Sequence, residues 1–122
     1  VDLPGYGYAK ISQSERKKWG NLINDFFSVS KHIQLTIHLI DSRHQPTELD
    51  IKLNDMLRKL DIPYIVLLNK SDKLKQSEYS IAKKKVIGIF PELILNENLF
   101  YFSSIKGTGS KEIKKLLTAL FY

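Results

Sequence analysis

Four polar residues that directly follow an apolar run have the types and spacing needed to read a guanine base. They are Asn69-Lys70-Ser71-Asp72, and the run before them is Tyr64-Ile65-Val66-Leu67-Leu68. Guanine presents N1–H and its 2-amino group as adjacent donors, and a carboxylate at Asp72 can accept both. Adenine offers no such pair, and a site that hydrogen-bonds a ligand group discriminates strongly against an analogue that lacks it. The pattern therefore favours GTP or GDP over an adenine nucleotide.

The neighbours of Asp72 can contribute to the same recognition. Asn69 can bond the N7 atom of the base and can also tie loops together. Lys70 can lay its methylene stem along the plane of the base while its ammonium group stays in water. The alternative is a polar turn after a buried strand, for which this composition is common. Two further segments favour guanine recognition.

One of these segments, Ser103-Ser104-Ile105-Lys106-Gly107, closes another apolar run. Backbone N–H groups at Ser103 and Ser104 could meet the O6 atom of guanine, and a hydroxyl there could orient Asp72. Taken alone, two serines before a Gly-Thr-Gly turn and a helix are more typical of helix capping. The segment 107–111 has glycines and a lysine but not the spacing of a phosphate loop, so we interpret it as a turn into the last helix.

The other segment, Asp2-Leu3-Pro4-Gly5, fits a strand-end aspartate that holds Mg²⁺ through water. The backbone N–H of Gly5 can approach a γ-phosphate because glycine has no Cβ. An ordinary turn is the alternative for so short a match. Tyr6 follows where many regulatory GTPases have a glutamine that orients the attacking water, and it cannot replace that amide. The catalytic residue is therefore unknown, and we expect slow hydrolysis or hydrolysis assisted by a partner.

The elements that must position these residues alternate between strands and amphipathic helices. This alternation predicts an α/β fold with a parallel sheet, helices on both sides and a ligand site at the carboxyl ends of the strands. The first helix carries an apolar stripe from Trp19 to Phe27 that should face the sheet. Strands are expected at 33–40, 64–68 and 99–102, and helices are expected from about 12 to 27, 46 to 60, 79 to 90 and 110 to 120.

Composition indicates one domain with a moderate positive charge. The 122 residues are 43% hydrophobic, enough for a single core. Lys and Arg number 19 against 13 Asp and Glu, and the net charge of +6 favours polyanionic partners such as RNA. The clusters at 16–18 and 83–85 are interpreted first as solvated helix faces. The three histidines lack metal-ligand spacing, and His38 is interpreted as structural. Cysteine is absent, which excludes disulfides.

Together these residues resemble the EngB (YihA) family of bacterial GTPases, which belongs to the Era-like, TRAFAC-class P-loop GTPases. The most specific similarity lies in a Pro-Gly-Tyr-Gly switch loop, an Ala-Lys pair and a downstream tryptophan. These features fall in Val1-Asp2-Leu3-Pro4-Gly5-Tyr6-Gly7-Tyr8-Ala9-Lys10 and at Trp19, and Ile40-Asp41-Ser42-Arg43-His44-Gln45-Pro46 is also similar to the family. The family commonly has Thr-Lys-x-Asp where this chain has Asn69-Lys70-Ser71-Asp72.

The resemblance implies the three-layer α/β/α fold of P-loop GTPases, a cytoplasmic bacterial protein and GTP/GDP and Mg²⁺ as cofactors. It also implies a role in large ribosomal subunit assembly, with rRNA or ribosomal protein as partner, and in normal cell division and septation. Nucleotide-binding roles carry over to Asp2, Gly5, Asn69, Lys70, Asp72, Ser103, Ser104 and Ile105, with Asp2 also the metal residue through water.

No G-x-x-x-x-G-K-[ST] phosphate loop occurs, and the chain begins at Val1 inside an expected strand. We therefore expect residues 1–122 to be the C-terminal portion of a single G domain, from the switch II loop through the last helix, truncated at the N-terminus. Alone, this portion should bind GTP poorly, lack GTPase activity and pair through exposed strand edges. The alternative function is a nucleotide-independent RNA- or protein-interaction module. No stable membrane anchoring is expected.

Overall fold

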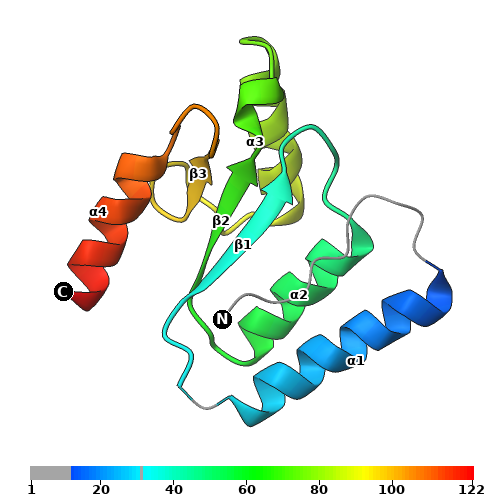
Figure 1. The fold of residues 1–122 in the computed structure, drawn as a ribbon. Coiled ribbons are helices and arrows are strands. Elements are labelled where there is room, and N and C mark those ends of the chain that lie inside the picture. The colour runs from blue at the N-terminus through cyan, green and yellow to red at the C-terminus, as the bar shows by residue number, and fades with distance from the viewer. Residues whose placement is uncertain (1–11, 31) are drawn as a thin grey trace.

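The computed structural model describes residues 12–30 and 32–122, and in these ranges strands and helices alternate (Figure 1). No helix in these ranges is both long and apolar enough to cross a bilayer. The elements in chain order are α1 (Gln13–Val29), β1 (Thr36–Asp41), α2 (Glu48–Lys59), β2 (Tyr64–Asn69), the 3-10 turn η1 (Ser71–Lys73), α3 (Glu78–Ile89), β3 (Leu99–Tyr101) and α4 (Ser110–Phe121).

The three described strands form one parallel sheet in the order β1-β2-β3, which confirms the predicted α/β fold class. β2 is central, and its residues from Ile65 to Leu68 are all buried, as expected for a strand covered on both faces. β1 begins at Thr36, three residues later than predicted. Thr36 pairs with Tyr64 and donates its N–H to the carbonyl of Pro63 at 2.9 Å. Pro63 has no N–H to extend the ladder further upstream.

Helices cover both faces of this sheet. Successive residues of a strand point to opposite faces. Val66 of β2 packs in one buried cluster with Val86 of α3, whereas Ile65 packs in another with Ile113 of α4. The helices α3 and α4 therefore lie on opposite sides of the sheet, as Figure 1 shows, and the arrangement has three layers.

The apolar stripe of α1 packs mainly on α2, in a cluster that Tyr64 at the start of β2 also contacts, so the sheet is only part of the surface that covers it. Ile23 and Phe27 are buried in one cluster with Leu53 and Leu57 of α2, and Trp19 packs against the same cluster. Helical periodicity specifies which face is buried but not which element covers it. In Figure 1, α1 runs beneath α2 at the border of the molecule.

A buried polar pair joins β1 to the start of α2. The Nε2 atom of His38 lies 2.9 Å from Oδ1 of Asp50, and both side chains are almost fully buried. Oδ2 of Asp50 accepts from the backbone N–H of Thr47 at 2.8 Å, which completes a capping box at the helix N-terminus. Burial lowers the pKa of His38 to about 4 and raises the pKa of Asp50 to about 6. His38 is thus structural, as its place on a strand predicted.

Candidate nucleotide-binding site

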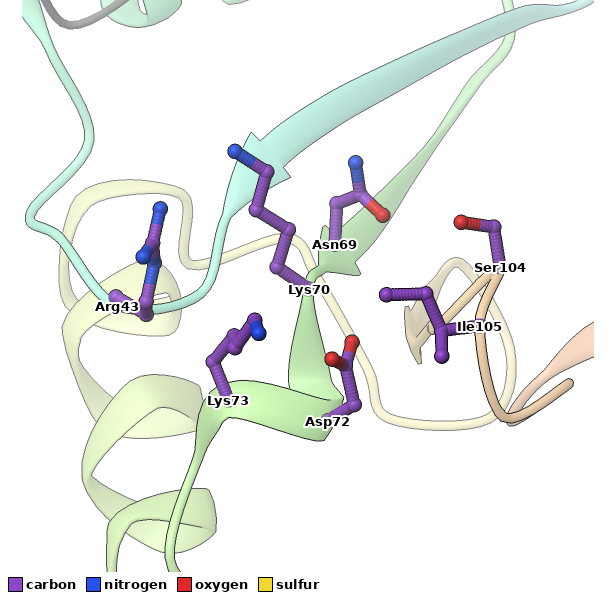
Figure 2. Close-up of a pocket in the computed structure, with 7 residues that line it drawn as sticks. All are labelled: Arg43, Asn69, Lys70, Asp72, Lys73, Ser104 and Ile105. Atoms are coloured by element: carbon purple, nitrogen blue, oxygen red, sulfur yellow. The ribbon is translucent and has the colours of Figure 1, made fainter.

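Three loops meet at the carboxyl ends of the strands and enclose a pocket of about 230 Å³. The loops follow β1, β2 and β3, so the site lies where a parallel α/β sheet usually binds its ligand. Figure 2 shows Ser104 and Ile105 facing the loop that follows β2, with Arg43 on the far side of Lys70. The lining residues are Arg43, Asn69, Lys70, Asp72, Lys73, Ser104 and Ile105.

The loop after β2 turns sharply at Lys70. This residue has φ 57° and ψ 33°, the left-handed conformation that costs a non-glycine residue about 1–2 kcal/mol. The turn leads directly into η1, where the N–H of Lys73 donates to the carbonyl of Lys70 at 3.0 Å. Ser71 is completely buried, and its N–H donates to the carbonyl of Phe102 at 3.0 Å. Strain at Lys70 is thus offset by bonds that place Asp72 beside the pocket.

Asp72 is held by a buried hydroxyl from the neighbouring loop. Oγ of Ser103 donates to Oδ1 of Asp72 at 2.8 Å and accepts from the backbone N–H of Lys106 at 3.1 Å. Ser103 has no exposed surface and supports the carboxylate from behind rather than lining the pocket. In Figure 2 the Asp72 carboxylate points toward the space between Asn69 and Ile105. A fixed carboxylate in this position can accept two adjacent donors from a planar ligand.

The loop after β3 keeps its shape through backbone bonds and one glycine. The N–H of Ser103 donates to the carbonyl of Thr108 at 3.0 Å, and the N–H of Gly107 donates to the carbonyl of Ser103 at 2.9 Å. Gly109 has φ +80°, and a Cβ there would lie 2.2 Å from the carbonyl oxygen of Tyr101. Only glycine fits at this position. The segment forms the predicted turn into α4.

Two tyrosines anchor the loop after β2 to α3. The hydroxyl of Tyr79 donates to the carbonyl of Ser71 at 3.1 Å, and the hydroxyl of Tyr101 donates to the carbonyl of Tyr79 at 2.7 Å. Their rings meet edge to face with centroids 4.9 Å apart. From the sequence alone, both tyrosines are only members of an expected helix and an expected strand. Their role depends on contacts between elements that periodicity does not reveal.

The structure brings together five of the predicted site residues in the pocket and places a sixth, Ser103, behind it. The five are Asn69, Lys70, Asp72, Ser104 and Ile105. Asp2 and Gly5, predicted to contact magnesium and phosphate, lie outside the described residues, as do Tyr6, Tyr8 and Lys10.

Sequence analysis missed two lining residues, Arg43 and Lys73. Arg43 stands two residues after the end of β1, and this position beside a strand end was the available signal. With Lys70, these residues give the pocket three basic side chains against the single carboxylate of Asp72. The three positive charges suit an anionic ligand, and the carboxylate suits a ligand that carries hydrogen-bond donors.

Comparison with known proteins places this chain in a family. Residues 1–70 match the 50S ribosome-binding GTPase family. The probable GTP-binding protein EngB of Ligilactobacillus salivarius is 37% identical over 113 residues, which are 93% of this chain and 57% of that protein. The EngB of Bacillus cereus is 36% identical over 117 residues, 96% of this chain and 59% of that protein. The chain thus spans less than two thirds of the length of these relatives.

Solved structures show the same fold. A crystal structure of a probable GTP-binding protein EngB aligns with a TM-score of 0.78 and 21% identity, covering 98% of this chain and 75% of that one. Translation elongation factor SelB from Methanococcus maripaludis aligns with a TM-score of 0.67 and 22% identity, covering 98% of this chain and 24% of that one. The resemblance to EngB expected from the sequence is confirmed, and because the matched segment covers more than half of the chain, the chain belongs to the 50S ribosome-binding GTPase family.

Proposed function

We propose that the pocket at the ends of β1, β2 and β3 binds the guanine base of GTP and GDP in a GTP-operated switch. The observation that carries this proposal is the Asp72 carboxylate, fixed by the buried Ser103 hydroxyl at 2.8 Å beside a pocket that Asn69 and Lys70 also line. Preorganised acceptors discriminate well because they lose their partner when the wrong ligand binds.

The proposed pose follows from the chemistry of the lining residues. Asp72 accepts the N1–H and 2-amino donors of guanine, and Asn69 bonds N7. The base lies between the methylene stem of Lys70 and the side chain of Ile105, which is 76% exposed and so has surface available for a ligand. Backbone N–H groups at Ser104 and Ile105 are the candidates for meeting O6. The N–H of Ser103, also expected from the sequence to reach O6, instead donates to the carbonyl of Thr108.

The pocket is sized for a base rather than for a whole nucleotide. Its volume of about 230 Å³ is below the roughly 300–1,000 Å³ of typical sites for larger ligands. In this proposal the phosphates extend beyond the pocket toward Asp2 and Gly5. The G-x-x-x-x-G-K-[ST] motif is absent from the 122 residues, and the proposal therefore assigns phosphate-loop contacts to residues other than these.

The finer parts of the proposal come from the family resemblance. They are a role in large ribosomal subunit assembly and septation, a cytoplasmic location and Mg²⁺ held through water by Asp2. The net charge of +6 supports an rRNA partner. Among the described residues, no group of three or more His, Cys, Asp or Glu side chains could hold a metal, so the magnesium proposal depends on Asp2. Removal of Mg²⁺ by EDTA is expected to weaken GTP binding.

The decisive experiment replaces the carboxylate at position 72, which only accepts hydrogen bonds, by an amide, which also donates them. It uses the full-length protein that contains these residues. Fluorescent GDP should be displaced by GTP but not by ATP. Asp72→Asn should reverse the preference from GDP to xanthosine diphosphate, which has an oxygen acceptor where guanine has its amino group. A change in the affinity ratio on the order of 10²-fold or more is expected. An unchanged preference for guanine would contradict the proposed pose.

A second outcome would replace the proposal with the alternative. If the wild-type protein binds neither GDP nor GTP, the guanine assignment fails. RNA binding that weakens steeply with salt and does not respond to nucleotide would then favour the nucleotide-independent interaction module.

A further inference from the structure

The carboxylate of Asp41, at the last position of β1, gathers two of the basic side chains that line the pocket. Its Oδ1 accepts from the backbone N–H of Arg43 at 3.0 Å and from Nε at 3.1 Å. Its Oδ2 accepts from Nη2 of Arg43 at 2.8 Å and lies 3.5 Å from Nζ of Lys70. One carboxylate therefore joins the loop after β1 to the loop after β2.

Asp41 is a rigid point of attachment. Its side chain is only 3% exposed, whereas those of Arg43 and Lys70 are 41% and 50% exposed. It stands opposite Asn69 in the β1–β2 ladder, and the N–H of Ser42 donates to the carbonyl of Asn69 at 2.9 Å. The backbone on both sides of the carboxylate is thus fixed by the sheet.

The charge of this carboxylate persists across the working pH range. Burial alone would raise the pKa of Asp41, but the hydrogen bonds and charge of Arg43 and the charge of Lys70 outweigh it and lower the pKa to about 2. An ionised, buried carboxylate is costly unless cationic donors compensate it, and Arg43 and Lys70 supply that compensation.

Long basic side chains are costly to order. Arg and Lys lose rotamer freedom when they are fixed, and a ligand that had to order them would bind more weakly. A carboxylate that fixes them in advance removes this cost. Lys70 is the side chain whose stem the base is proposed to contact, so its placement bears directly on affinity.

We propose that Asp41 is a positioning residue of the nucleotide pocket. Its contacts fix the side chains of Arg43 and Lys70, which together form the basic wall of the pocket, in the positions that the base contacts. The inference rests on the proposed guanine function of this pocket. Asp41 does not line the pocket, so it acts through the two side chains that do.

The test is a double-mutant cycle in the full-length protein, with GDP and inosine diphosphate as ligands. Asp41→Asn keeps the side chain's size and is expected to weaken both by about tenfold, because the basic wall does not read the 2-amino group. In a Lys70→Met background, which keeps the stem and removes the charge, the same change should cost less than about threefold. Glu92→Gln is the matched control, since Glu92 is a hydrogen-bonded acid at the other end of β2 and should leave affinity unchanged.

A purely structural role gives a different result. It would lower the melting temperature while the folded protein kept its GDP affinity, or would reduce affinity equally in both backgrounds, and either finding overturns the proposal. If Asp41→Asn does not fold, Arg43→Gln tests the same point on a half-exposed side chain. That variant should bind both nucleotides several-fold more weakly, and unchanged binding overturns the proposal. Wild-type protein that binds no GDP would instead reject the guanine function itself.

Discussion

The hydroxyl of Ser103 is the smallest group on which the candidate site depends. It is buried, it donates to Asp72, and it accepts from the N–H of Lys106. A hydrogen bond to a charged group contributes more than one between neutral groups because the charge strengthens the attraction. Without this bond, the Asp72 carboxylate would be free to rotate away from the base.

Replacement of Ser103 by alanine is therefore expected to weaken GDP binding about tenfold, in line with the loss of one charge-assisted hydrogen bond. Ser104→Ala is the matched control, because Ser104 is exposed and keeps its backbone N–H after the change. Its affinity should stay within about twofold of the wild type. Titration with fluorescent GDP measures both variants, and equal losses would show that Ser103 does not orient Asp72.

At this scale, sequence reasoning succeeds where side-chain chemistry is local. The types and spacing of Asn69, Lys70 and Asp72 point to one loop, and the structure places all three beside the pocket. Arg43 could not be placed in the same way. Its place beside the pocket depends on the parallel pairing of β1 with β2, which is a tertiary contact, although its bonds to Asp41 join residues only two positions apart.

Among the elements, the junction between β3 and α4 tolerates the least change. Gly109→Ala must accept a left-handed backbone and a Cβ 2.2 Å from a carbonyl oxygen. We expect a loss of more than about 2 kcal/mol in the free energy of unfolding and a weaker GDP site, because the loop of Ser103 begins at the same junction.

Gly88→Ala provides the opposite case. Gly88 lies within α3, and a Cβ there would meet nothing within 4 Å. Alanine favours the helix, so a gain of about 0.5–1 kcal/mol is expected. Urea denaturation measures both variants, and a Gly109→Ala protein as stable as the wild type would refute the argument from the close contact.

The His38–Asp50 pair predicts a hidden pH dependence. Burial lowers the pKa of His38 from 6.5 to about 4 in the folded state. Between these pH values the unfolded state binds the proton more readily, so a fall in pH favours unfolding. Asp50 titrates near pH 6, above its ordinary 3.8, so over a similar range it favours folding as the pH falls. The two effects offset each other, and the pair contributes little slope between pH 4 and 6.

Asp50→Asn should reveal the contribution of His38. The folded variant lacks the proton held by Asp50, so its free energy of unfolding should fall by up to about 3 kcal/mol more than that of the wild type between pH 6.5 and 4. Urea titrations at several pH values measure the difference. Parallel pH profiles for the two proteins would contradict the pairing.

The boundaries of helices and strands could be predicted where residues close in the sequence determine them. Ser12 caps α1 and Thr47 caps α2, close to the positions that the sequence indicated. The start of β1 differs from the prediction because the ladder begins where Thr36 bonds Pro63, the residue before β2, which has no N–H to extend it. Similarly, the stripe of α1 gave its buried face but could not identify α2 as its partner.

At the scale of the molecule, one side of β1 is left uncovered by the described residues 12–30 and 32–122. β1 is an edge strand of the described sheet. Its residues Ile37 and Leu39 are 42% and 53% exposed, although both belong to a strand of the core sheet. An open edge beside exposed apolar side chains is a template for association.

The isolated 122-residue chain is therefore expected to self-associate at micromolar concentration. The double change Ile37→Lys and Leu39→Lys should shift it toward the monomer, because charge on an edge strand opposes pairing. Ile94→Lys is the matched control, since Ile94 is also 53% exposed but lies outside the strands. Sedimentation velocity distinguishes these cases, and a monomeric wild-type chain would refute the expectation.

The place of Trp19 gives the molecule a built-in optical reporter. It is the only tryptophan in the chain, and it packs against the α1–α2 cluster rather than lining the base pocket. Emission excited at the tryptophan band therefore senses the contact between two helices, whereas a labelled nucleotide senses the pocket. If the tryptophan signal also changes when nucleotide is added, the event at the ends of the strands has been transmitted to α1, and the delay after the nucleotide signal gives the rate of that transmission.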